Sequence, residues 1–149
     1  MVMTIGCDQV TKHIATDRLS GNPGLSFLAD TLRLEYAENT GAFLSLGENL
    51  PDNIRTPLLV GGCGLMLVGL VVFAVRFRVI GGVLVSISLI VAGGMSNLID
   101  RIAHGRVIDF LNLGVGDFRT GIFNVADIAI VAGVILFAWA SRRGLAQVE

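Results

Sequence analysis

The chain has 149 residues, of which 53% are hydrophobic and only 15% are charged. Soluble globular domains carry about 25% charged residues, so this composition excludes a water-soluble domain and indicates an integral membrane protein. The formal net charge of −1 provides no basic surface for nucleic acid, and we expect no nucleic-acid partner.

The first predicted element is a helix at about residues 1–16. It is uncharged at its start and then carries Asp8 and Lys12, with the acid first, which is the favourable order for an ion pair across one helical turn. The segment 17–57 follows as an outer lobe. The alternation in Leu32–Tyr36 predicts a short strand in this lobe.

Two windows without charged residues, at about 58–75 and 79–99, predict the second and third helices. A bilayer core requires about 20 mostly apolar residues per helix, and both windows meet that requirement. An outer loop at 100–119 leads to the last predicted helix, 120–141, in which Asp127 is the only charged residue.

Arginine residues determine the expected orientation. Arg76 and Arg78 occupy the short link between the second and third helices, and Arg142 and Arg143 follow the last helix. The positive-inside rule places both groups in the cytoplasm, so the lobe and the outer loop face the opposite side. We therefore predict an all-α membrane protein with four transmembrane helices and a small extracytoplasmic β-like lobe, folded as one integral-membrane domain over residues 1–149.

Polar residues gather at the outer ends of the predicted helices and in the outer segments. They form four clusters, Asp8–Lys12, Asn39–Phe43, Asn97–Asp109 and Asn124–Asp127. Such convergence at one face predicts a site there.

Local spacing leaves a structural alternative open for three of these clusters. Asp8 with Lys12 forms either a structural ion pair or part of the site. Asp100 and Arg101, which lie within one turn of Asn97, can instead mark the membrane surface. Asn124 lies three residues before Asp127, on the same helical face, so it can bond a carboxylate or cap a helix.

Asp127 is the residue with the strongest functional indication. A carboxylate within an apolar stretch long enough for a membrane is costly and is retained for function. Asp109 is a second carboxylate that can meet it near the outer edge of the bilayer. Two nearby carboxyls do not both ionise easily, so one stays protonated and polarises a carbonyl while the other takes a proton from water. The pair titrates as a unit, so its proton is assigned to neither residue.

Water activation by two carboxyls is typical of a hydrolase, but two other classes of protein share some of these features. A small transporter or proton-coupled permease also keeps lone carboxylates within its helices. Such proteins have more spans, with interrupted helices that meet at the midplane, whereas the polar residues here gather at one face, which favours an enzyme. A passive membrane scaffold leaves Asp127 unexplained.

Five short motifs in this sequence resemble those of the lipoprotein signal peptidases, the signal peptidase II family of bacterial aspartyl peptidases. They are D-Q-V-T-K at Asp8–Lys12, N-T-G-A-F at Asn39–Phe43, G-G-M-S-N-L-I-D-R at Gly93–Arg101, G-R-V-I-D-F at Gly105–Phe110 and F-N-V-A-D at Phe123–Asp127. They follow the order of the family and nearly its spacing. The chain departs from the family at Ser96, where glycine is common, and in having only seven residues before Asp8, where the family has a fuller first helix.

The resemblance implies a function and a set of roles. Asp109 and Asp127 match the catalytic pair of the family. The matching positions for substrate binding and support are Asn39, Gly41, Asn97, Asp100, Arg101, Asn124, Asp8 and Lys12. By the same resemblance the enzyme uses no metal or other cofactor and cuts diacylglyceryl-modified prolipoproteins just before the lipidated cysteine. We expect a monomer surrounded by membrane lipid in the bacterial inner membrane, with its active site on the extracytoplasmic face.

Overall fold

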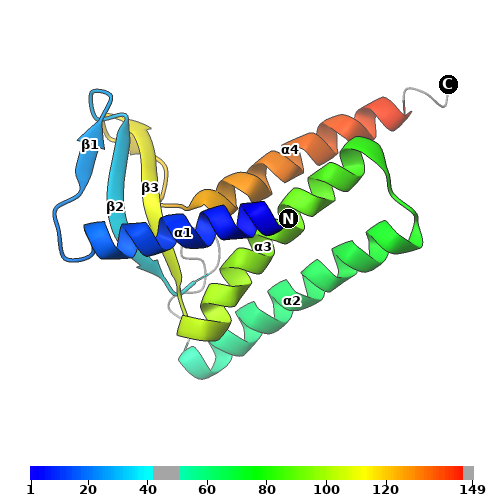
Figure 1. Ribbon diagram of the computed structural model, residues 1–149, viewed down its shortest axis with the longest axis horizontal. Coiled ribbons are helices and arrows are strands. Elements are labelled where there is room, and N and C mark those ends of the chain that lie inside the picture. Colours follow the sequence, from blue (N-terminus) through cyan, green and yellow to red (C-terminus); the bar gives the residue numbers. More distant parts are fainter. Residues whose placement is uncertain (42–50, 146–149) are drawn as a thin grey trace.

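The computed structural model describes residues 1–41 and 51–145 (Figure 1). The elements in chain order are α1 (Val2–Leu19), β1 (Leu25–Phe27), β2 (Leu32–Asn39), α2 (Asp52–Arg76), α3 (Gly81–His104), β3 (Val107–Val115), β4 (Phe118–Arg119) and α4 (Val125–Leu145). Helix α3 is central and packs against α1, α2 and α4. Figure 1 shows the sheet at one end of this bundle and the link between α2 and α3 at the other end.

Three helices in the described part of the chain are long and apolar enough to cross a membrane. They are α2 from Asn53, α3 over its full length, and α4 as far as Arg142. Helix α1 does not meet the same criterion, because its 18 residues include four charged ones, Asp8, Lys12, Asp17 and Arg18. A fourth transmembrane helix therefore stays a prediction.

Two helix boundaries differ from those expected from the sequence, and both bear on the site. Helix α3 continues to His104, so Asp100 and Arg101 lie within it rather than in an outer loop. Helix α4 begins at Val125 rather than at residue 120, because Phe123 is extended and pairs with Leu111 of β3. Asp127 therefore lies in the first turn of α4, at the end of the span and not in its interior.

The described strands form one antiparallel sheet in the order β1-β2-β3-β4, built from both outer segments of the chain. Sequence reasoning expected a strand in the first segment only. The register pairs Ala37 with Asp109 and Asn39 with Val107. Opposed residues project from the same face of a sheet, so Asn39 and Asp109 are diagonal neighbours on one face. Pairing of β2 with β3 thus brings two polar residues together that are distant in the sequence.

Glycines of α3 allow the bundle to pack closely around this end. A Cβ atom at Gly93 would lie 2.3 Å from the carbonyl oxygen of Ala126 in α4, and one at Gly94 would lie 2.7 Å from the Leu67 side chain of α2. Small residues are the usual means by which membrane helices approach each other. The contact at Gly93 holds the first turn of α4 against α3.

Candidate active site

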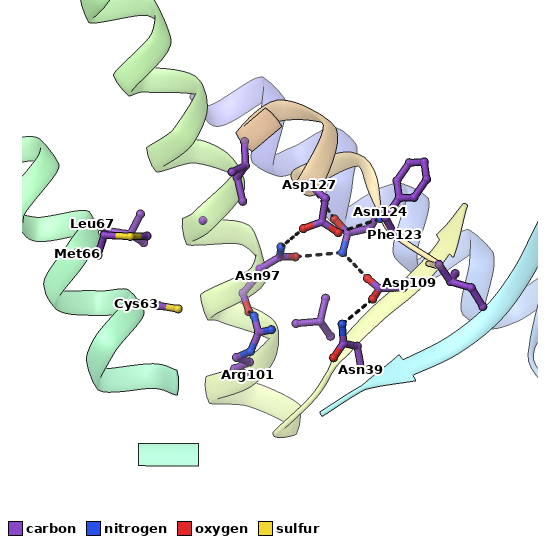
Figure 2. A pocket seen from close by; sticks show the side chains of 14 residues that line it. Asn39, Cys63, Met66, Leu67, Asn97, Arg101, Asp109, Phe123, Asn124 and Asp127 are labelled. Atoms are coloured by element: carbon purple, nitrogen blue, oxygen red, sulfur yellow. Dashed lines mark hydrogen bonds between the residues drawn. The ribbon is translucent and has the colours of Figure 1, made fainter. Parts of the chain in front are cut away.

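Asp109 and Asp127 line one cavity of about 290 Å³ at the sheet end of the bundle (Figure 2). Asp109 projects from β3 and is only 3% exposed, and Asp127 is half-buried in the first turn of α4. Asn39 reaches the cavity from β2, and Asn97 and Arg101 reach it from α3. The structure therefore gathers polar side chains from two strands and two helices around the two carboxylates.

Asn124 connects the two carboxylates. Its side-chain Nδ2 donates to Asp109 Oδ1 at 2.6 Å, and its backbone N–H donates to Asp127 Oδ2 at 3.1 Å. Its Oδ1 accepts from the backbone N–H of Asp127 at 3.0 Å. This reciprocal pattern is a capping box, and the helix dipole adds stabilisation for a carboxylate in the first turn. Asn124 therefore both caps α4 and bonds the carboxylates, which were the two alternatives left open by its spacing.

The remaining carboxylate oxygens accept hydrogen bonds from two further asparagines. Asn39 Nδ2 donates to Asp109 Oδ2 at 2.9 Å, and Asn97 Nδ2 donates to Asp127 Oδ1 at 2.9 Å. Figure 2 shows these bonds as a continuous chain from Asn39 to Asn97 through both aspartates. Each carboxylate oxygen is thus held by one N–H donor, so both side chains have a defined orientation toward the cavity.

Burial raises the pKa of Asp109 to about 6, and the nearby charge of Asp127 acts in the same direction. Hydrogen bonds from Asn39 and Asn124 stabilise the ionised form and oppose this rise. Desolvation is the largest contribution, since loss of water penalises the charged carboxylate more than the neutral acid. A carboxyl that titrates near neutral pH is suited to proton transfer in general acid–base chemistry.

Behind the carboxylates lies a buried ionic cluster built on Lys12. Its Nζ lies 2.6 Å from Oδ2 of both Asp8 and Asp100, and each of the three residues is at most 5% exposed. The predicted pair of Asp8 and Lys12 is therefore present and fully buried. Asp100 belongs to the same cluster, so it has a buried ion-pair partner in addition to its place at the outer end of α3.

Asp8 also reaches the first turn of α4. Its Oδ1 accepts from the backbone N–H of Ala126 at 2.7 Å, and its Oδ2 accepts from Ser96 Oγ at 2.8 Å. Gln9 belongs to the first polar cluster, but no role was predicted for it; its Nε2 donates to Ser96 Oγ at 3.0 Å and to Asp100 Oδ1 at 2.9 Å. No local spacing indicates these contacts, because α1 meets α3 and α4 only through packing.

Arg101 holds the chain just after β2. Its Nη2 donates to the carbonyl of Gly41 at 2.7 Å, and its Nη1 donates to the carbonyl of Asn97 at 3.3 Å. Its Nε is buried without a partner among the described residues. The sequence leaves open whether the Arg101 guanidinium holds a substrate carbonyl or a loop carbonyl, and the structure shows a bond to a carbonyl of the chain itself. The sequence also predicts that the outer lobe covers the substrate, partly through Phe43, Leu44 and Leu46, and these three lie outside the described residues.

The sides of the site are apolar. Cys63, Met66 and Leu67 of α2 line the cavity opposite the carboxylates. A second, almost wholly apolar groove of about 570 Å³ adjoins Asp127 and runs along the outer face of α4 past Ile128, Val131 and Ile135. The sequence did not predict these wall residues on α2 and α4, because the apolar residues that line a site in a membrane protein have no distinguishing composition.

Comparison with known proteins shows similarity over nearly the whole chain. A family model described as signal peptidase (SPase) II matches residues 1–143. A lipoprotein signal peptidase of Sphingopyxis alaskensis is 40% identical over 131 residues, covering 87% of this chain and 75% of that protein. A lipoprotein signal peptidase of Chlorobium phaeobacteroides is 37% identical over 152 residues, covering 94% and 92%.

The fold is also similar to solved structures. A bacterial membrane enzyme solved at 2.3 Å by the in meso method superposes with a TM-score of 0.82 at 27% identity, covering 99% of this chain and 88% of that one. A second bacterial membrane enzyme, solved at 1.9 Å, gives a TM-score of 0.80 at 30% identity, covering 93% and 87%. The likeness therefore extends over both the helices and the sheet.

Proposed function

Because this chain belongs to the signal peptidase II family of multi-pass inner-membrane peptidases, we propose that it removes signal peptides from prolipoproteins with Asp109 and Asp127 as its catalytic pair. The observation that carries this proposal is the chain of hydrogen bonds that aims both carboxylates into one cavity. A pair of carboxyls held in this way supports water activation without a nucleophilic side chain.

In the proposed reaction a water molecule sits between the two carboxyls and the scissile carbonyl. The ionised carboxylate takes a proton from the water, whose oxygen forms the new bond to the carbonyl carbon. The protonated carboxyl donates a hydrogen bond to the carbonyl oxygen, which becomes the negative oxygen of the tetrahedral intermediate. Collapse of the intermediate breaks the peptide bond, and the leaving nitrogen takes a proton from the pair. The products are a free carboxylate and a free amine.

The raised pKa of Asp109 supports this use of the pair. A carboxyl with a pKa of about 6 holds a proton for part of the time at working pH, so one proton shared by the pair is attainable. The proton belongs to the coupled pair, and we assign it to neither aspartate.

The apolar groove beside the carboxylates supports a lipid-modified substrate. The groove along α4 begins at Asp127 and continues over residues of a membrane-spanning helix. An acyl chain attached next to the scissile bond would have an apolar surface there beside the carboxylates. We therefore propose a diacylglyceryl-modified prolipoprotein as substrate, cut just before its lipidated cysteine.

The proposed topology places the site on the extracytoplasmic face. Arg76 and Arg78 lie at the link between α2 and α3, at the opposite end of the bundle from the sheet. The positive-inside rule puts that link in the cytoplasm.

A transporter is a weaker alternative on this geometry. Asp127 lies in the first turn of α4, where the capping box and Asn97 satisfy both its oxygens. Carboxylates of transporters lie near the midplane of interrupted helices, whereas this one lies at the end of a span.

A cleavage assay tests the proposal. Purified protein in detergent is mixed with a prolipoprotein peptide that carries diacylglycerol on its cysteine, and with the same peptide without lipid as a control. We expect cleavage of the lipidated peptide, with mass spectrometry placing the cut before the cysteine. Asp109→Asn and Asp127→Asn should each nearly abolish turnover, and the double variant should be little worse, because residues that act as a unit are non-additive. Substantial turnover by either single variant would remove that aspartate from the catalytic pair.

A further inference from the structure

Lys12 makes one contact that a structural ion pair does not require. Besides its two carboxylates, its Nζ donates to Asn97 Oδ1 at 2.8 Å. An ammonium group has three donors and no acceptor. Its Nζ donates to Asn97 and to Asp100 and forms an ion pair with Asp8, and the residue is only 3% exposed. These three partners fix the position of the ammonium group.

This contact determines which end of the Asn97 amide faces the dyad. Because Lys12 is always a donor, Asn97 must present its oxygen to it, and its Nδ2 then points to Asp127 Oδ1 at 2.9 Å. A reversed amide would place its NH2 group against the ammonium and its oxygen against a carboxylate. Both contacts would be repulsive in a buried environment, where unpaired polar groups are costly.

The other two asparagines at the dyad have their amides oriented differently. Asn39 Oδ1 accepts from the backbone N–H of Gly41 at 3.0 Å, and Asn124 Oδ1 accepts from the backbone N–H of Asp127 at 3.0 Å. A backbone N–H can only donate, so these two contacts fix the orientation of the Asn39 and Asn124 amides without help from Lys12. The Asn97 amide also accepts from Asn124 Nδ2 at 3.2 Å, but its shorter, charged contact is with Lys12.

We propose, on the basis of the function proposed above, that Lys12 is a positioning residue of the reaction, which acts by holding the Asn97 amide with its N–H toward Asp127. The two carboxylates hold the ammonium group in place, so the cluster serves the dyad as well as the fold. Loss of the donor at position 12 frees Asn97 to present its oxygen to Asp127. Asp127 then loses a donor that orients it for proton transfer.

A matched pair of variants separates this role from that of a structural ion pair. Lys12→Gln with Asp100→Asn keeps an N–H donor near Asn97, and Lys12→Met with Asp100→Asn removes it. Each removes one positive and one negative charge, so the net charge of the cluster stays the same. Glutamine and methionine have similar lengths, so packing changes are comparable.

The readouts are kcat and KM for the lipidated peptide, together with the melting temperature in detergent. We expect the two variants to have similar melting temperatures. The methionine variant should lose about 10- to 100-fold in kcat, the factor of one charge-assisted hydrogen bond, with little change in KM. The glutamine variant should keep the greater part of the activity. Equal kcat values in two folded variants would overturn the proposal, and failure of the wild-type protein to cleave would instead reject the proposed function.

A third variant covers the case in which the methionine variant does not fold. Asn97→Leu leaves Lys12 with both carboxylates but removes the donor to Asp127. We expect a comparable loss of kcat at nearly unchanged KM, which a residue that only binds substrate would not produce. Full kcat in this variant would overturn the proposal. A rise in KM with unchanged kcat would do the same and would make Asn97 a substrate contact.

Discussion

Asn124 provides a sharp test of the site, because one side chain performs two separable tasks. Its Oδ1 caps α4 and its Nδ2 bonds Asp109, and the residue is fully buried. Asn124→Ala removes both contacts. Loss of an N-cap costs about 1 kcal/mol, and loss of a hydrogen bond to a charged group costs about 2 kcal/mol. We therefore expect Asn124→Ala to lower the free energy of unfolding by about 3 kcal/mol.

Asn124→Ser is the matched control. Serine is a good N-cap residue whose hydroxyl can still accept from the N–H of Asp127, but it has no NH2 group to reach Asp109. We expect it to recover the capping contribution of about 1 kcal/mol and none of the contact with Asp109. Denaturant titration of both variants in the same detergent measures this difference.

The alanine and serine variants of Asn124 should differ in stability but not in catalytic activity. Both variants lose the bond to Asp109, so both should lose turnover by a similar factor, about 10- to 100-fold for one charge-assisted bond. Serine should therefore restore stability but not cleavage of the lipidated peptide. If cleavage recovers together with stability, the bond from Asn124 to Asp109 has no part in the reaction and the reasoning about the dyad is refuted.

Three further predictions follow from the surroundings of the dyad. The pKa of Asp109 is about 6 in the folded protein and about 4 in an unfolded chain, so its contribution to stability is present below about pH 4 and lost as the pH rises through 6. The stability of wild type relative to Asp109→Asn should thus fall by up to about 3 kcal/mol over that range, and a flat difference across pH would contradict the assigned burial. Arg101→Lys keeps the charge but cannot reproduce the fork that binds the Gly41 carbonyl. It should reduce cleavage, and unchanged kinetics would leave Arg101 without a role at the site. Asp8→Ala leaves Lys12 with one carboxylate and removes the acceptor of the Ala126 N–H, so unfolding in detergent should become easier by about 3–5 kcal/mol. A melting temperature equal to that of wild type would show that the pair is not structural.

The sequence alone was sufficient for the features that depend on composition and local spacing. Charge-free windows predicted the spans because the bilayer requires about 20 apolar residues, and the three spans at α2, α3 and α4 are confirmed. The ion pair of Asp8 with Lys12 and the contact of Asn124 with Asp127 were predictable for the same reason. Residues three or four apart meet on one turn of a helix.

Only the tertiary structure decided how these local pieces meet. The start of α4 at Val125 depends on the pairing of Phe123 with β3, and this places Asp127 in a first turn with a capping box. The approach of Asn39 to Asp109 depends on the register of β2 against β3. The bond from Asp8 to Ala126 joins α1 to α4 across most of the chain. Such contacts leave no periodic trace in a sequence, because they depend on how helices and strands pack and not on spacing along any one of them.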